Sequence, residues 1–102
     1  MAYDQSIIEA IRARAREVSD PKKRSRYLRA ALQTGIVESG LRNLNYGDAD
    51  SQGWRQERAS LYRNPTNVRA SVDRFFDEAA QLDRGQKSYQ LAADVQRPAA
   101  SW

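Results

Sequence analysis

The chain has 102 residues with 40% apolar content, a formal net charge of +4 at pH 7, and neither histidine nor cysteine. These figures describe a single globular domain with one modest core, and they exclude disulfides, thiolate nucleophiles, histidine-based triads and the usual zinc sites. A catalytic proton carrier should therefore be a carboxylate, with Tyr or Lys as weaker candidates, while the basic charge favours polyanionic partners or a simply solvated surface.

The first predicted element is an amphipathic helix. Ser6 and Glu9 have the spacing of a capping box, in which each side chain satisfies a backbone N–H of the first turn. Apolar residues then recur at helical spacing, which places one stripe against a core. This stripe consists of Ile7, Ile8, Ile11, Ala15 and Val18.

A second helix is predicted to begin near Asp20-Pro21, because a capping aspartate followed by proline is typical of a helix start. The basic residues that follow are unfavourable near the positive end of the helix dipole, so a start a few residues later is also consistent. The helix should run to about Ser39, and Gly40 can end it in a left-handed conformation.

The end of this second helix holds the strongest catalytic candidate, Glu38. It lies on a stripe of small and half-polar residues beside the stripe expected to face the core. The expected core stripe is Leu28, Leu32 and Ile36, and the neighbouring stripe is Tyr27, Ala31, Thr34, Gly35 and Glu38. A carboxyl group beside apolar residues can remain protonated near neutral pH and so act as an acid.

The rest of the chain predicts a polar turn region and two further helices. Residues 43–56 are rich in glycine, asparagine and aspartate, which favours turns with a small hairpin. Several capping residues in 64–67 precede the clearest helical periodicity of the chain, formed by Val68, Val72, Phe75, Phe76, Ala79 and Leu82. Ser88 should cap a short fourth helix that Pro98 ends. The predicted fold is mainly α, with about four helices and a small polar loop or hairpin after the second.

Glu38 followed by Asp48 and Asp50 is a pattern that suits glycoside cleavage. One carboxylic acid protonates the leaving oxygen, and a second group supplies a nucleophile, holds a water or stabilises the transition state. From the residues alone, a catalytic glutamate and an ordinary solvated one both stay open.

Two other patterns have competing interpretations. Residues 48–53 resemble the first half of an EF-hand calcium loop, but Ala59 stands where the bidentate acid is needed, so turn formation explains the aspartates better. The arginines with Tyr46, Trp54 and Tyr62 suit single-stranded nucleic acid. However, the arginines are spread along the chain, and aromatic rings stack equally well on sugars.

Two segments resemble the signature of the lytic transglycosylase and goose-type lysozyme superfamily. Residues 31–41 read Ala-Leu-Gln-Thr-Gly-Ile-Val-Glu-Ser-Gly-Leu, and residues 51–56 read Ser-Gln-Gly-Trp-Arg-Gln. The whole run 35–56 is most similar to lysozyme-like domains of actinobacterial phages, which occur in tail tape-measure and lysin proteins and in related host proteins. Residues 91–98 are similar to a later segment of these domains, so the resemblance covers roughly residues 28 to 98.

The resemblance implies an α-rich lysozyme-like fold in which Glu38 acts as general acid and then base. The bond cleaved joins N-acetylmuramic acid to N-acetylglucosamine in peptidoglycan. Ser39 matches the usual neighbour of the catalytic glutamate, and Gly53 and Gln56 fall in the family's Gly-Leu-Met-Gln segment. Trp54-Arg55 departs from that segment by placing a charge where packing is expected, and Tyr89 is a candidate for the family's substrate-binding tyrosine.

The sequence therefore predicts a peptidoglycan-cleaving domain of a phage tail or lysin, located in the virion tail or the host cell envelope. The catalytic candidates are Glu38, Asp48 and Asp50, and the candidates for substrate contacts are Ser39, Tyr46, Ser51, Gly53, Trp54, Gln56 and Tyr89. The expected partner is the glycan strand, with no cofactor, metal, nucleic acid or membrane insertion, and with no signal peptide. Hydrolysis and anhydro-sugar formation both stay open. The rival interpretations are a noncatalytic structural or glycan-binding tail domain and a basic nucleic-acid-binding module.

Overall fold

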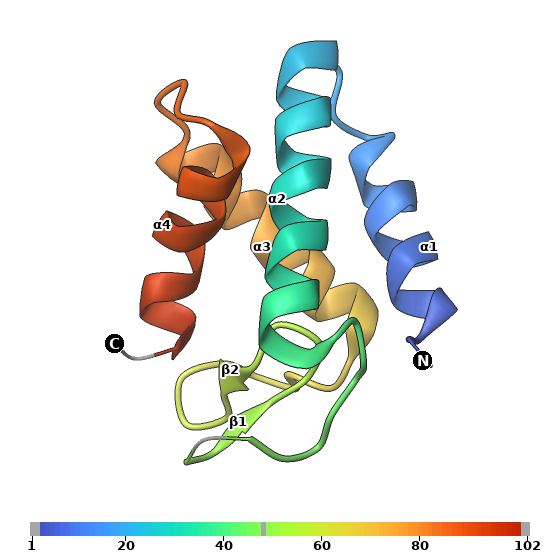
Figure 1. The fold of residues 1–102 in the computed structure, drawn as a ribbon, viewed down its shortest axis with the longest axis vertical. Coiled ribbons are helices and arrows are strands. Elements are labelled where there is room, and N and C mark those ends of the chain that lie inside the picture. The colour runs from blue at the N-terminus through green and yellow to red at the C-terminus, as the bar shows by residue number, and fades with distance from the viewer. Residues whose placement is uncertain (1–2, 48, 101–102) are drawn as a thin grey trace.

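A computed structural model describes residues 3–47 and 49–100 of the chain. Within these residues the order of elements is α1 (Gln5–Ala15), α2 (Pro21–Ser39), β1 (Ser51–Gln52), β2 (Glu57–Arg58), α3 (Val68–Leu82) and α4 (Ser88–Ala100). The helix α2 stands between α1 and α4, α3 packs behind it, and the hairpin lies below the C-terminal end of α2 (Figure 1). The prediction of a mainly α fold with a small hairpin after the second helix is confirmed.

The helices begin at side chains that accept hydrogen bonds from the first turn. Asp4 caps α1 by accepting from the Ser6 amide at 3.0 Å, so the prediction that Ser6 caps this helix is wrong. Asp20 accepts from the Lys22 amide at 2.9 Å and caps α2, which begins directly at Pro21. The carboxylate next to these lysines offsets their unfavourable interaction with the helix dipole.

The buried face of α2 differs from the predicted one. Its buried residues are Tyr27, Ala30, Ala31, Thr34, Gly35 and Ser39, whereas Ile36 is 60% exposed and Leu28 and Leu32 are only partly buried. Small residues face the interior because α2 contacts all three other helices at close range. At Gly35, an added Cβ atom would collide with the Leu41 side chain and press on the Trp54 ring.

Two helix ends also differ from the prediction. The helix α1 ends at Ala15, before Val18, and α4 continues through Pro98 to Ala100. Proline removes one backbone donor, a loss that a helix tolerates with a local bend, and alanine is the strongest helix former.

The core lies where the four helices meet above the hairpin. Phe75 and Phe76 on α3 are both buried, and the Trp54 ring lies 5.8 Å from the Phe75 ring between centroids. The other buried apolar residues are Ile7, Ile11, Ala15, Tyr27, Ala30, Ala31, Leu41, Val72, Ala79, Leu91, Ala92 and Val95.

A buried ion cluster fixes the hairpin to α3. The side chains of Arg55 and Glu57 have no exposed surface. Arg55 lies 2.7 Å from the Glu78 carboxylate and 3.4 Å from that of Glu57. Glu57 also accepts from Arg74 at 2.7 and 2.9 Å and from the Ser71 hydroxyl at 2.7 Å. Arg55 carries the charge that departs from the lysozyme-like signature, and acidic partners balance this charge.

The ion cluster predicts a large cost for Glu57→Gln. This change leaves two guanidinium groups without their shared carboxylate, so the free energy of unfolding should fall by about 3 kcal/mol. Urea unfolding measures the difference, with Glu9→Gln on the exposed side of α1 as the matched control, expected within about 0.5 kcal/mol of wild type. A cost for Glu57→Gln as small as that of the control would contradict a central role for the cluster.

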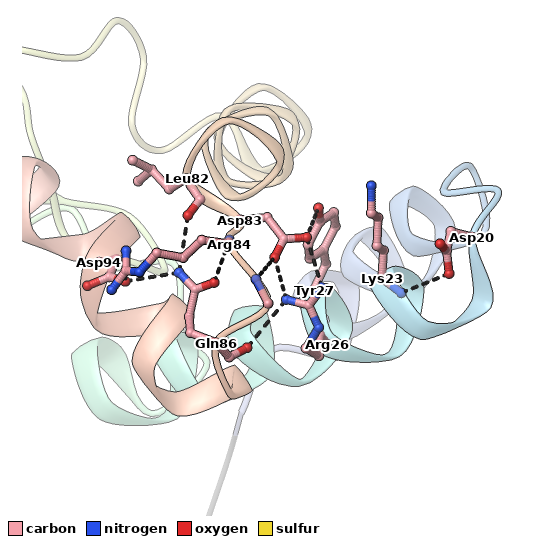
Figure 2. Close-up of polar contacts among 10 residues, drawn as sticks. Asp20, Lys23, Arg26, Tyr27, Leu82, Asp83, Arg84, Gln86 and Asp94 are labelled. Atoms are coloured by element: carbon pink, nitrogen blue, oxygen red, sulfur yellow. Dashed lines mark hydrogen bonds and ion pairs between the residues drawn. The ribbon is translucent and has the colours of Figure 1, made fainter.

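A second polar cluster joins the turn between α3 and α4 to α2. Asp83 accepts two hydrogen bonds from Arg26, at 2.6 and 2.9 Å, and one from the Tyr27 hydroxyl at 2.8 Å (Figure 2). Gln86 bridges the Leu82 carbonyl and the Asp94 carboxylate in the same view. The Arg26 hydrogen bonds are the main reason that the pKa of Asp83 lies well below its usual range. Burial, followed by the bond to Asp83, raises the pKa of Tyr27 to about 12.

The Asp83 cluster predicts a loss of stability in acid. The unfolded chain takes up a proton at Asp83 near pH 4, whereas folded Asp83 does so only at lower pH, so the free energy of unfolding falls as the pH drops below about 4. In Asp83→Asn this contribution is missing, and the curve between about pH 4 and pH 2 should be flatter. Urea unfolding over a pH series tests this, with the more exposed Asp77→Asn as control. Parallel curves for wild type and Asp83→Asn would overturn the assignment.

In the part of the chain that the structure describes, no helix combines the length and the apolar composition needed to cross a membrane.

Candidate active site

A cleft of about 330 Å³ lies between α2 and α4. Its lining residues are Gln33, Thr34, Val37 and Glu38 from α2, and Tyr89, Ala92, Ala93 and Gln96 from α4. Residues three and four positions apart lie on the same face of a helix, so each set forms one continuous wall. Two alanines on α4 leave the space that larger side chains would fill.

The cleft brings together two of the candidate residues, Glu38 and Tyr89. Glu38 is the second-last residue of α2 and is half-buried, and Tyr89 on the facing wall is 63% exposed. A half-buried glutamate and an exposed tyrosine that line the same cleft suit a ligand that has both polar edges and a flat apolar face, as a sugar has.

The turn of the hairpin holds both walls of the cleft. The Ser39 hydroxyl, next to Glu38, donates to the Trp54 carbonyl at 2.6 Å. The side-chain amide of Gln96 on α4 donates to the Arg55 carbonyl at 2.8 Å. We call this pair of hydrogen bonds to consecutive carbonyls the carbonyl bridge. The buried ion cluster also holds Arg55 in place. The carbonyl bridge therefore fixes the distance between α2 and α4 through the hairpin.

Ser39 therefore has a structural position. Its oxygen is buried, donates to the Trp54 carbonyl and accepts from the Arg42 amide at 3.0 Å, so its hydrogen-bonding capacity serves the end of α2. A direct substrate contact, as expected from the sequence, does not fit this placement.

Three further candidates for substrate contacts lie in the interior. Trp54 has no exposed surface and packs on Phe75, so its ring cannot stack on a sugar at the surface. Gln56 is 8% exposed and donates to the carbonyls of Tyr46 and Gly53. Gly53 has a φ of +87°, and an added Cβ atom would collide with the Pro65 carbonyl. The family-like segment 51–56 thus shapes the turn beside the cleft.

The other loop candidates that the structure describes lie apart from the cleft lining. Asp50 forms an ion pair with Arg58 and accepts from the Ser60 amide at 2.7 Å, and these bonds lower the pKa of Asp50 to about 2. Ser51 is buried at the start of β1, Tyr46 is 62% exposed, and Asp48 falls outside the described residues. Within those residues, no group of three or more acidic side chains could hold a metal ion.

Most residues of the cleft lining were not predicted from the sequence. Thr34 lies one helical turn before Glu38, and this spacing indicates that the two residues share one face of α2. On α4, Tyr89, Ala92, Ala93 and Gln96 recur at helical spacing, and the alanines in this stripe indicate either close packing or a cleft. Only the arrangement of the two helices distinguishes these alternatives.

Comparisons with protein-family models, with curated proteins and with solved structures found no match. The resemblance to lysozyme-like domains therefore stays a prediction.

The carbonyl bridge predicts a cost for Ser39→Ala. The change leaves the Trp54 carbonyl and the Arg42 amide without their partner, so the free energy of unfolding should fall by about 1–3 kcal/mol. Ser25→Ala on the exposed side of the same helix is the matched control and should change it by less than about 0.5 kcal/mol. Equal urea midpoints for the two variants would show that the bridge does not stabilise the fold.

Proposed function

We propose that the chain is a peptidoglycan-cleaving glycosidase domain in which Glu38 is the general acid and base. The observation that carries the proposal is the shared cleft, in which Glu38 on α2 faces the wall that carries Tyr89 on α4. The residue that the family resemblance assigns to catalysis thus lies at a ligand-sized cavity, together with the residue that resembles the family's tyrosine.

The proposed reaction is lytic transglycosylation. Among the described residues that line the cleft, Glu38 supplies the carboxyl group, and Asp50 is engaged by Arg58 elsewhere. Anhydro-sugar formation needs one acid/base group, whereas hydrolysis commonly uses a second carboxylate. Glu38 donates a proton to the glycosidic oxygen as the bond from C1 to that oxygen breaks. The C6 hydroxyl of the same sugar then attacks C1, and its proton returns to Glu38.

The arginines support this proposal over a nucleic-acid-binding module. Many of them already have acidic partners: Arg14, Arg26, Arg55, Arg58, Arg69, Arg74 and Arg84 all form ion pairs. Of the aromatic residues suited to base stacking, Trp54 is buried and Tyr62 lies beneath the guanidinium groups of Arg55 and Arg74. The surface therefore offers fewer phosphate and base contacts than the net charge indicates.

Digestion of purified peptidoglycan tests the proposed function. Wild type should release anhydro-muropeptides, identified by mass spectrometry, and Glu38→Gln should lower the rate by about 10²- to 10⁴-fold, with a urea unfolding curve that shows the variant to be folded under the assay conditions. Glu9→Gln is the matched control and should retain the wild-type rate. If wild type releases products with reducing ends, the reaction is hydrolysis and not transglycosylation. A lack of products on walls of several actinobacteria would leave a noncatalytic glycan-binding or structural domain.

A further inference from the structure

We propose that the end of the molecule where α1 turns into α2 binds a flexible polymer of phosphodiester-linked units that carry no bases. This inference goes beyond the proposed function and does not depend on cleavage. The first 29 residues hold eight Lys and Arg against four Asp and Glu, whereas the other 73 residues hold nine of each. The net charge of +4 therefore comes from the part of the chain that forms α1, the α1–α2 turn and the first half of α2.

Four cations in this region are available to a ligand. We call them the basic end, and they are Arg12, Arg16, Lys22 and Lys23. All four are exposed, and none of them forms an ion pair within the part of the chain that the structure describes. Their neighbours Arg14 and Arg26 are instead paired with acids of α3 and of its C-terminal end.

The two lysines lie where the fold gains nothing from a positive charge. They belong to the first turn of α2, at the positive end of the helix dipole, where acidic side chains are the stabilising ones. Asp20 accepts from the backbone amides of Lys23 and Lys22, and these bonds lower the pKa of Asp20 more than the ammonium charges do. Figure 2 shows the bond reaching the Lys23 backbone, while the Lys23 side chain extends elsewhere. Cations at a position that is unfavourable for the helix indicate a role outside folding.

The turn that carries the basic end is held in a fixed shape. Arg24 donates from Nε to the Val18 carbonyl at 2.8 Å and from Nη2 to the Ser19 carbonyl at 3.1 Å. These bonds fasten the turn to α2, so a ligand does not have to order the turn when it binds.

The basic end is also remote from the cleft. The α1–α2 turn lies at the end of the molecule away from the hairpin (Figure 1). Glu38 follows Lys22 at a distance of about 24 Å along the axis of α2. A polymer at the basic end therefore leaves the cleft accessible.

The chemistry of the basic end selects a phosphate polymer without bases. Guanidinium and ammonium groups both bind phosphate oxygens, and a flexible chain can bring successive phosphates to cations on two helices. The structure describes all of residues 12–29, and none of the exposed large apolar or aromatic side chains lies among them. Nucleic-acid binding gains from bases stacked on aromatic rings, and membrane binding needs an exposed apolar face. We therefore assign the basic end to the polymer and use single-stranded DNA as a contrasting ligand.

Fluorescence anisotropy with labelled poly(glycerol phosphate) tests this assignment in a salt series. The double variant Lys22→Glu, Lys23→Glu should bind at least about tenfold more weakly than wild type at low salt. The logarithm of the association constant should fall against that of the salt concentration with a slope of about −3 for wild type and about −1 for this variant, because two of four phosphate contacts are lost. The matched control is Arg63→Glu, Lys87→Glu, which changes two exposed cations elsewhere to give the same net charge. The control should keep the wild-type slope.

A stability measurement separates a binding role from a structural one. Glutamate is favourable in the first turn of a helix, so Lys22→Glu, Lys23→Glu should have a urea midpoint equal to or above that of wild type. Weaker binding without loss of stability is the expected signature. A lower midpoint with unchanged binding would give the lysines a structural role and overturn the inference.

Four further results would contradict it: no binding of the polymer at low salt, binding that does not depend on salt, equal weakening by the control variant, or tighter binding of oligothymidylate with the same number of phosphates. The last result would make the basic end a nucleic-acid site. Failure of the proposed function is a separate outcome, because no peptidoglycan is present in these titrations. A domain that cleaves no peptidoglycan but binds the polymer through the two lysines retains the inference. An active domain that does not bind the polymer refutes the inference alone.

Discussion

The hairpin turn accepts hydrogen bonds from α2 and α4, two helices that are far apart in the sequence. These bonds hold the two walls of the candidate site together. Consecutive carbonyls at Trp54 and Arg55 accept from Ser39 on α2 and from Gln96 on α4. The turn itself is immobilised by Trp54 in the core and by the buried ions around Arg55. Because the same two helices line the cleft, a small β element that contributes no lining residue controls the spacing of its walls.

This arrangement gives the family-like segment 51–56 a structural meaning. Four of its residues, Ser51, Gly53, Trp54 and Gln56, were expected to contact sugar, yet Trp54 and Gln56 are buried and stabilise the turn. The charge at Arg55 would destabilise an apolar interior by itself. The carboxylates of Glu57 and Glu78 offset this destabilisation. Removing one member of such a cluster lowers the free energy of unfolding by more than the complete cluster adds to it relative to apolar residues in the same place. The proposed chemistry is correspondingly concentrated in the cleft between α2, which carries Glu38, and α4, which carries Tyr89.

The sequence predicted those features that depend on local patterns. The Asp20-Pro21 start, the left-handed Gly40 and the periodicity of α3 follow from backbone geometry and apolar spacing, and all are present. The predicted buried face of α2 was wrong, because its largest aliphatic side chains were expected to face the core. Close packing against three other helices favours small side chains along most of the buried face, so Ala31 and Gly35 face inward and Ile36 faces solvent. The cleft depends on how α2 and α4 are placed across the 48 intervening residues 40–87, a long-range arrangement that no local pattern encodes.

The central claim is that a glycan binds between α2 and α4 with its scissile bond at Glu38. A crystal structure of the Glu38→Gln variant with a tetrasaccharide of alternating N-acetylglucosamine and N-acetylmuramic acid tests it most directly. We expect sugar rings along the cleft, with a glycosidic oxygen within hydrogen-bond distance of the side chain at position 38. Sugar bound on the hairpin surface or on α1, with the α2–α4 cleft unoccupied, would contradict it.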